Sequence, residues 1–580
     1  MRRWKLAVAA TTVAVLGMTG CGGPSGPGPD GDGGDVGGTQ FAGMDPDAKG
    51  PAPEVPGAVA GGTITVYSQS TPHTFDPTNI YFTDTYEIAR LVFRTPTQFD
   101  IRDGNAVLVP DLTDLGTVSE DGLTWTFKLK GKFKYSDGSD VKIEDLAYAV
   151  KRSFAHELFA DGPTYQLTYF KDADTYKGPY ESGDNYAGVE TPDAETLVIH
   201  LDRPFPDLPF YMSFPLFTPI PKEKDTRENY QNNPLATGPY MFESYTPGVE
   251  LKLVRNPHWD PNTDPVRHQY PERWEFKWGG DDVVTQQQVL NSSNPVDAAA
   301  LNYGNLDASL IPQLTGEKRQ QLLTGISPCT IVYQMDTRKI PLEVRKAIAK
   351  AHPYDQTWTA EGLNEFVAEP ASTVLPPSVQ GYEKYEPHPD LDGTGPGDPE
   401  AARAMLEAAG QLGFELSWYY DNTLPVPQQI TQVLVDAYRA AGFNPKPIGV
   451  TTAELRAKRA DYEAPVNMLQ SPAGWCSDWP TGGSWFPVLF QTHSISDGTS
   501  WGMLSDPALD KKIDDILALP AAEQTARWAE LDKEIMGMYI VLPRYYAKNA
   551  NVMGTRIGNA VNDVTVGMPF FPVMYVKPAA

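Results

Sequence analysis

The chain has 580 residues and carries 47 Lys and Arg against 74 Asp and Glu, which gives a net charge of −27. Such an acidic chain is not expected to bind nucleic acid, because phosphate binding needs clustered Lys and Arg. A single hydrophobic core stops growing near about 250 to 300 residues, so a chain of this length is predicted to form two or more lobes.

The start of the chain has the pattern of an export signal. Basic residues precede an apolar run from Leu6 to Met18, which is too short to span a bilayer comfortably. The stretch Met18-Thr19-Gly20-Cys21 resembles the bacterial lipobox, in which the Cys becomes the lipidated first residue after cleavage. We therefore expect residues 1–20 to be a signal peptide and Cys21 to carry a lipid anchor. The alternative is an ordinary signal peptide that contains a Cys.

Residues 21–60 are predicted to be a flexible tether. From Gly22 to Ala60 the chain is almost entirely Gly, Pro, Asp, Ala and Ser, a composition that cannot bury enough apolar surface to offset chain entropy. The packed fold is expected to start at Gly61. After Cys21 no segment offers the roughly twenty consecutive apolar residues of a membrane span, so membrane attachment is expected to depend on the lipid alone.

Beyond Gly61 the apolar pattern predicts strands and helices. The run from Ile64 to Tyr67 is β-prone, and residues 124–129 alternate apolar and polar positions before a turn at 136–138. A helix is predicted from Glu144 to Leu158, because apolar residues recur there at four-residue spacing.

A second group of elements predicts a parallel crossover unit. Asp398 is a good N-cap, Pro399 suits the first helical position, and Gly410 is a C-terminal stop. A strand is then predicted at 414–419, a helix at 426–441 and a strand at 443–450. Since strand, helix and strand at this spacing favour parallel pairing, the chain is predicted to mix α and β structure.

Few residues suit catalysis, a cofactor or a metal. The eight His lack the spacing of metal sites, and the chain has no Walker loop, dinucleotide Gly fingerprint or GxSxG. Ser139-Asp140-Val141-Lys142 fits the SxxK pattern of penicillin-binding enzymes, but it lies in a turn and no KTG element accompanies it. We therefore predict no catalytic residue, no cofactor and no metal; an extracellular hydrolase is a remote alternative.

Residues 471–490 are unusually rich in aromatic side chains around a single acidic residue. Around a single acid, Asp478, this segment places Trp475, Trp479, Trp485, Phe486 and Phe490. Aromatic rings beside a lone carboxylate would bind a cation or an ammonium group with an apolar neighbour. The alternative is a Trp-rich core loop whose Asp caps a turn, and composition does not separate the two.

Two cysteines remain once Cys21 is assigned to the lipid. Cys329 and Cys476 form an even pair in a compartment that permits disulfides. A bond between them would close a loop of about 147 residues and stabilise the fold by roughly 5 kcal/mol if chain entropy sets the gain.

Short motifs spread along the chain resemble those of one family. In chain order they are Gly61-Gly62-Thr63-Ile64, Asp76-Pro77, Pro110-Asp111-Leu112, residues 136–146, Thr237-Gly238-Pro239-Tyr240, Pro247-Gly248, Arg255-Asn256-Pro257-His258-Trp259 and Arg345-Lys346-Ala347-Ile348. Together they are similar to the extracytoplasmic solute-binding proteins of peptide-type ABC importers, family 5, which include the oligopeptide- and dipeptide-binding proteins. The SxxK match falls inside the motif at 136–146, which marks it as structural. The family's Asp-Arg is altered here to Asp355-Gln356.

This resemblance implies an α/β, periplasmic-binding-protein-like two-lobed fold of the class C type, with an additional subdomain inserted in the first lobe. Lobe I is expected to be discontinuous and to comprise 61–100, 218–328 and 544–580. The inserted subdomain is expected at 101–217 and lobe II at 329–543.

The oligopeptide-binding subgroup implies where a ligand binds. Its members can carry a WCAD segment whose Cys is bonded to another Cys just before a strand, which Trp475-Cys476-Ser477-Asp478 and Cys329-Thr330-Ile331-Val332-Tyr333 resemble. By this resemblance Cys329 pairs with Cys476, and Asp478 binds the ammonium group of a peptide. Further ligand contacts are expected from Gly474, Trp475, Cys476 and Trp479, and a second strand of contacts from Tyr81, Phe82 and Thr83.

The function that follows is capture of extracellular peptides between two lobes and their delivery to the permease of an ABC importer, without catalysis. The expected protein is a monomer, held by its lipid on the extracytoplasmic face of the cell membrane. One alternative is the same fold binding an oligosaccharide, a metal chelate or a glycolipid, since Trp rings stack on sugars. Another is a signalling lipoprotein that senses peptides.

Overall fold

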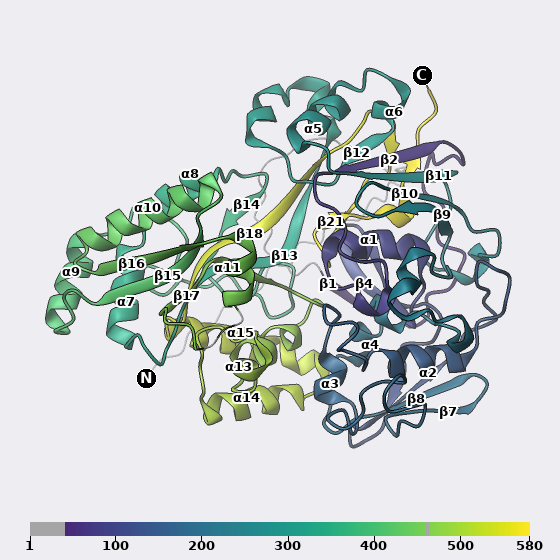
Figure 1. Cartoon of the computed structure of the whole chain (residues 1–580), viewed down its shortest axis with the longest axis horizontal. Helices are drawn as coiled ribbons and strands as arrows, with labels where there is room; N and C mark the ends of the chain where they lie inside the picture. Colours follow the sequence, from purple (N-terminus) through teal and green to yellow (C-terminus); the bar gives the residue numbers. More distant parts are fainter. Residues whose placement is uncertain (1–40, 460, 462, 580) are drawn as a thin grey trace, which may run out of the picture. The chain divides into compact units, whose positions relative to one another are not determined.

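The computed structural model describes residues 41–459, 461 and 463–579. The predicted signal peptide and the predicted lipidation site Cys21 lie outside the described residues. Within the part of the chain that is described, none of the helices is both long enough and apolar enough to cross a membrane. The structure mixes helices and sheets, as predicted (Figure 1).

One five-stranded sheet, in the order β12-β2-β11-β10-β9, combines residues 63–68 with strands from residues 240–302. β2 pairs in parallel with both β11 and β12, so it occupies an interior position. Its buried residues Ile64 and Val66 lie in register with the buried residues Trp274 and Phe276. The strands are β2 (Thr63–Ser68), β9 (Tyr240–Thr246), β10 (Glu250–Arg255), β11 (Arg273–Trp278) and β12 (Ala300–Asn302). The adjoining helices are α1 (Thr83–Val92), α5 (Asp282–Asn291) and α6 (Pro295–Ala298).

A four-stranded antiparallel sheet has the order β14-β18-β13-β17. Its two long strands, β13 and β18, extend from the group of helices around α10 toward β12 and α5 (Figure 1). β17 lies at the edge of this sheet, so within the described chain one side of its backbone has no partner strand in the sheet. The strands are β13 (Leu322–Met335), β14 (Ala368–Pro370), β17 (Met468–Cys476) and β18 (Val541–Val552).

The predicted crossover unit is confirmed. β15 (Glu415–Asp421) pairs in parallel with β16 (Asn444–Val450), and α10 (Pro425–Ala440) connects them. The preceding helix α9 (Pro399–Ala408) begins as predicted, because the Asp398 carboxylate accepts a hydrogen bond from the Ala401 backbone N–H at 2.9 Å. Nearby helices are α7 (Leu342–Ala351), α8 (Tyr354–Glu361), α11 (Thr452–Arg459), α12 (Phe486–Phe490), α13 (Ser494–Asp497), α14 (Pro507–Leu517) and α15 (Ala521–Gly537).

A third sheet, in the order β5-β6-β8-β7, includes the strand predicted at 124–129. Helix α2 (Ile143–Arg152) contacts it but ends six residues before the predicted end at Leu158. Beyond Arg152 the backbone continues in tighter turns, in which the Ala155 N–H donates to the Arg152 carbonyl at 3.0 Å. The Ser153 carbonyl oxygen there accepts a hydrogen bond of 2.9 Å from the Gln166 side chain. The remaining elements here are β5 (Thr117–Val118), β6 (Thr124–Lys128), β7 (Val189–Asp193), β8 (Thr196–His200), α3 (Tyr165–Tyr169) and α4 (Leu208–Tyr211).

The packed structure starts earlier than predicted. Phe41–Met44 forms β1, which pairs in parallel with β4 (Asn105–Pro110), itself paired with β3 (Thr97–Arg102). The Asp45 carboxylate also forms an ion pair of 2.7 Å with Arg102. The prediction of a flexible tether is therefore wrong for residues 41–60, because local composition does not reveal a distant partner strand such as the one that pairs Phe41 with Ala106. The rest of that segment lies outside the described residues.

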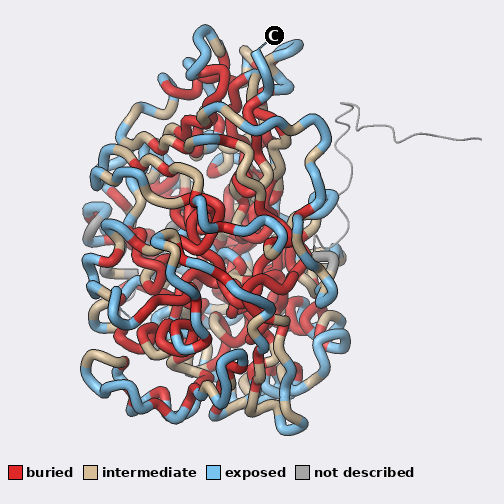
Figure 2. Tube along the Cα trace, turned by 90° about the vertical axis from the view of Figure 1, so that its right-hand side faces the viewer, coloured by how far each residue is buried: buried red, intermediate tan, exposed pale blue. Residues whose placement is uncertain are grey.

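Buried hydrophobic side chains form three large cores. In Figure 2 the buried segments lie mostly inside the molecule and the exposed segments on its outside. The first core draws on residues 332–542, and the second mainly on residues 86–217. The third combines residues 64–93 and 236–303 with the C-terminal segment 553–576. That segment includes two small antiparallel pairs, β19 (Ile557–Gly558) with β22 (Tyr575–Val576) and β20 (Asn562–Asp563) with β21 (Met568–Pro569).

Buried ion pairs explain two of the sequence motifs. Asp76, in the Asp-Pro motif, accepts two hydrogen bonds of 2.6 and 2.7 Å from the Arg152 guanidinium at the end of α2. Asp111, in the Pro-Asp-Leu motif, pairs with Arg94 at 2.7 Å and with Arg267 at 2.9 Å. Because a buried charge needs a partner, these acids join segments that are distant in sequence.

Candidate ligand-binding site

A cavity of about 260 Å³ lies between the residues before α1 and the end of β17. Tyr81, Phe82 and Thr83 line one side of it, and Trp475 to Asp478 line another. The remaining wall is mostly apolar and consists of Tyr86, Phe99, Phe214, Pro328, Thr565 and Val566. None of these lining residues is Lys, Arg or His, so Asp478 is the charged side chain that the described wall presents.

Asp478 is held by two phenols. Tyr81 donates a hydrogen bond of 2.9 Å to Oδ2 of Asp478, and the Tyr165 hydroxyl donates to the same oxygen. Burial raises the pKa of Asp478 to about 7, although both hydrogen bonds act to lower it. A cation entering the cavity would restore the ionised carboxylate, so this arrangement suits an ammonium group on an apolar body.

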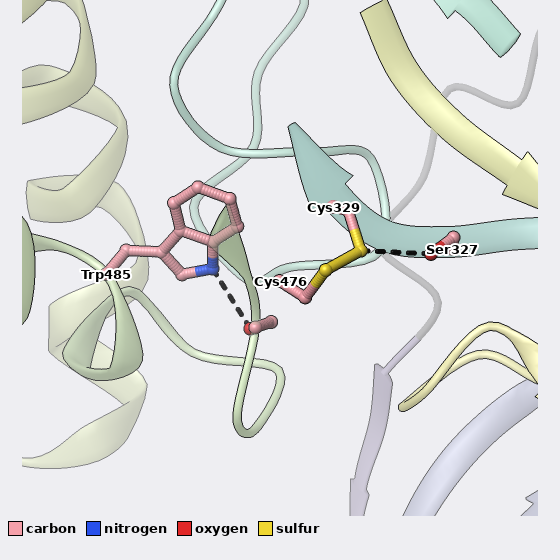
Figure 3. Close-up of a disulfide and its surroundings, with 5 residues drawn as sticks. Ser327, Cys329, Cys476 and Trp485 are labelled. Atoms are coloured by element: carbon pink, nitrogen blue, oxygen red, sulfur yellow. Dashed lines mark hydrogen bonds between the residues drawn. A yellow bond between two sulfur atoms is a disulfide. The ribbon is translucent and has the colours of Figure 1, made fainter. Parts of the chain in front are cut away.

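A disulfide fixes the strand that leads into Asp478. Cys329 in β13 and Cys476 in β17 lie directly opposite each other and are bonded, as predicted (Figure 3). The Ser477 backbone N–H then donates to the Pro328 carbonyl at 2.8 Å. The turn that follows is braced by Trp485, whose indole N–H donates to the Ser477 hydroxyl at 3.0 Å (Figure 3).

The structure brings together six of the predicted ligand contacts. Tyr81, Phe82, Thr83, Trp475, Cys476 and Asp478 all line the cavity. The first three do not form a strand, because Phe82 is the N-cap of α1 and Thr83 is its first helical residue. Gly474 lies just before this set, within β17, and is outside the cavity wall.

Trp479 is placed differently from the prediction. Its side chain is 1% exposed and lies in the core formed by residues 86–217, against Tyr165 and Phe205, instead of lining the cavity. Trp485, Phe486 and Phe490 are also buried. For these four rings the core interpretation of the 471–490 segment holds, and Trp475 is the aromatic residue of that segment at the cavity.

Three residues of the site carried no signal in the sequence. Tyr165 reaches Asp478 from 313 residues away, and Thr565 and Val566 come from the C-terminal segment. Tyr165 stands among many Tyr residues without a motif of its own, so only the folded chain identifies it.

Comparisons with known proteins give a consistent result. The model of the bacterial extracellular solute-binding proteins, family 5 Middle, matches residues 107–496. The periplasmic oligopeptide-binding protein OppA of Salmonella typhimurium is 23% identical over 462 residues, which cover 76% of this chain and 79% of that protein. The glutathione-binding protein GsiB of Escherichia coli K12 is 25% identical over 441 residues, 70% of this chain and 73% of that protein.

Solved structures agree on the fold. The clavulanic acid biosynthesis oligopeptide binding protein 2 superposes with a TM-score of 0.81 at 24% identity, over 90% of this chain and 96% of that one. The ABC transporter-associated periplasmic binding protein DppA from Helicobacter pylori, solved in complex with the peptide STSA, gives a TM-score of 0.69 at 16% identity, over 90% and 99% of the two chains. The two-lobed α/β fold predicted from the sequence is therefore confirmed.

Proposed function

Since this chain belongs to the bacterial extracellular solute-binding proteins of family 5, we propose that it captures peptides by their amino end and delivers them to the permease of an ABC importer. Recognition of the amino end is supported by the Asp478 carboxylate, which accepts hydrogen bonds from Tyr81 and Tyr165. Among the described residues of the cavity wall, no other side chain is charged. An ammonium group would supply the missing positive charge.

The edge of β17 supports a peptide as the body of the ligand. Trp475 and Cys476 are the last residues of this edge strand and border the cavity. An extended peptide can pair with such an edge through its own N–H and C=O groups, and this binding does not depend on the side chains of the peptide. Similarity to proteins named for binding oligopeptides and glutathione points to the same class of ligand.

The position of the Trp residues argues against an oligosaccharide. Sugar recognition by stacking needs exposed ring faces, yet Trp479 and Trp485 are 1% and 0% exposed. Of the three Trp residues considered for stacking, Trp475 alone lines the described cavity.

Further parts of the proposal follow from the family. We propose that the protein binds without catalysis, acts as a monomer and is held by lipid at Cys21 on the extracytoplasmic face of the membrane. The three buried cores support a division into lobe I (61–100, 218–328 and 544–580), an inserted subdomain (101–217) and lobe II (329–543). A signalling role would use the same binding event, and loss of peptide uptake on deletion of the gene would favour the importer.

Calorimetry with a matched pair of ligands tests the proposal. Phe-Ala-Ala presents an ammonium group, and 3-phenylpropanoyl-Ala-Ala has the same shape without it. We expect the first ligand to bind about 10 to 100 times more tightly, the range for a hydrogen bond to a charged group, and Asp478→Ala to remove the difference. Equal affinities for the wild-type protein would refute the proposal.

A further inference from the structure

The carboxylate of Asp207 holds the chain segment that follows Asp478. Asp207 lies just before α4 and is 3% exposed. Its Oδ2 accepts one hydrogen bond of 2.7 Å from the Trp479 indole N–H and another of 2.7 Å from the Thr481 hydroxyl. Burial raises the pKa of Asp207 to about 6, and these two neutral donors are the groups that oppose the rise. Both of these hydrogen bonds therefore tie the buried Asp207 carboxylate to the segment that follows Asp478.

Packing fixes the same segment. The ring centroid of Trp479 lies 4.6 Å from that of Tyr165 and 5.8 Å from that of Phe205, inside a core to which its neighbours in sequence do not belong. Trp479 thus anchors the residues that follow β17 in the core around α3 and α4.

Gly483 allows the close approach of the carboxylate. A Cβ atom at position 483 would lie 2.1 Å from Oδ2 of Asp207, so a side chain there would push the carboxylate out of its place. The Ser484 hydroxyl closes the turn by donating to the Trp479 carbonyl at 2.8 Å. Residues 479–484 therefore form a braced turn built around Asp207.

We propose that Asp207 is a positioning residue for ligand capture: by holding Trp479 and Thr481 it keeps the adjacent Asp478 facing Tyr81 and Tyr165 in the closed arrangement of the lobes, where the ligand is held. Asp478 and Trp479 are consecutive, so clamping the indole limits the orientations open to the carboxylate. A binding group that is already oriented loses less conformational freedom when the ligand binds. This inference rests on the proposed recognition of an ammonium group by Asp478.

The test compares Asp207→Ala and Asp207→Asn with Asp174→Ala, which changes an exposed acid at another place in the same subdomain. For each protein, calorimetry gives the ratio of the affinities for Phe-Ala-Ala and its analogue without the ammonium group. Asp207→Ala is expected to reduce this ratio about tenfold, which is the effect of losing about one hydrogen bond to a charged group. The affinity for the analogue is expected to change less than threefold. Asp207→Asn, whose amide oxygen still accepts both hydrogen bonds, and Asp174→Ala are expected to keep the ratio.

Thr481→Val provides a second variant, since it removes one donor and leaves the acid and the Trp479 ring in place. It is expected to reduce the ratio about threefold, less than Asp207→Ala does, because the Trp479 indole still donates to the carboxylate. An unchanged ratio in Asp207→Ala and Thr481→Val, an equal loss for both ligands, or a loss in Asp207→Asn as large as in Asp207→Ala would each overturn the inference and leave the proposed function intact. A wild-type protein that does not distinguish the two ligands would instead refute the proposed function, and the inference with it.

Discussion

The Tyr81 hydroxyl donates a hydrogen bond of 2.9 Å to Oδ2 of Asp478, although 397 residues separate the two in the sequence. Tyr165 donates to the same oxygen. Both phenols therefore donate to one carboxylate oxygen, and we expect a ligand ammonium to pair with the other, Oδ1.

Peptide affinity is predicted to pass through a maximum between about pH 7 and pH 8. The pKa of Asp478 is raised to about 7, so a lower pH protonates the carboxylate that must face the ammonium group. Below pH 7 the affinity should fall about tenfold per pH unit, and above pH 8 the peptide amino group, with a pKa of about 7.7 to 8.0, loses its own charge. Calorimetry with Phe-Ala-Ala from pH 5 to pH 9 measures the profile. A constant affinity between pH 5 and pH 7 would contradict this assignment of the titrating group.

Asp478→Asn is predicted to stabilise the protein without ligand at pH 8. The folded-state pKa of Asp478 lies above its unfolded value, so the stability that this residue contributes is present at pH values below about 4 and is lost as the pH rises through 7. The amide carries no charge and should gain about 1 to 2 kcal/mol at pH 8, a range that allows for solvent screening of a partly buried group. Thermal unfolding at pH 8 and at pH 4 measures the gain, which should shrink at the lower pH. A variant that unfolds at a lower temperature than the wild type at pH 8 would show that the charge stabilises the fold.

Amidation of the peptide carboxyl end is predicted to leave the affinity within about threefold. No Lys, Arg or His lines the described cavity wall, so a buried ligand carboxylate would lack a partner there. The ligand is therefore expected to extend its carboxyl end toward solvent. Calorimetry with Phe-Ala-Ala and Phe-Ala-Ala amide makes the comparison. If the free acid binds ten times more tightly, a cation from elsewhere in the chain must reach the ligand.

Helices and strands that depend on residues close by in the sequence could be predicted from the sequence. The N-cap Asp398 and the alternation of strand, helix and strand at 414–450 depend on neighbours in the sequence, and the structure agrees with them. The helix starting near Glu144 was predicted too long, since the backbone after its end continues in tighter turns, where Gln166 donates to the carbonyl of Ser153. That contact involves a residue 13 positions away, which periodicity does not reveal.

The candidate site was only partly predictable for the same reason. Asp478 stood out as a lone acid among aromatic residues, and the resemblance to a family drew attention to Tyr81, Phe82 and Thr83. The burial of Trp479, which is 1% exposed, could not be predicted from the composition of its segment, because the core that buries it comes mostly from residues 86–217. Asp207 carried no signal at all, since its role depends on Trp479 and Thr481 folding against it.

Removing the disulfide is predicted to cost about 2 to 5 kcal/mol of unfolding free energy. Cys329 and Cys476 are separated by 147 residues, so the bond greatly restricts the unfolded chain. The measurement is urea unfolding of Cys329→Ala/Cys476→Ala beside the wild type. Dithiothreitol should lower the stability of the wild type toward that of the variant and leave the variant unchanged. Equal unfolding curves for the two proteins without reductant would contradict a stabilising disulfide.

Replacing Arg152 is predicted to be among the more destabilising changes to the fold, because the acids around it would lose their partner. The side chain is 0% exposed, bonds Asp76 at 2.6 and 2.7 Å and lies 3.3 Å from Asp225. Arg152→Met keeps much of the volume but leaves two carboxylates without a cation, which should cost about 3 to 5 kcal/mol.

Arg102→Met is the matched control for this change. Arg102 forms ion pairs with Asp45 and Asp100 at similar distances, but its side chain is 41% exposed. Water solvates the partners that such a residue leaves behind, so the control should cost less than about 1 kcal/mol. Urea unfolding of both variants gives the comparison. If the two cost the same, the Asp76–Arg152 pair does not hold α2 to the segment before α1, and another contact must join them.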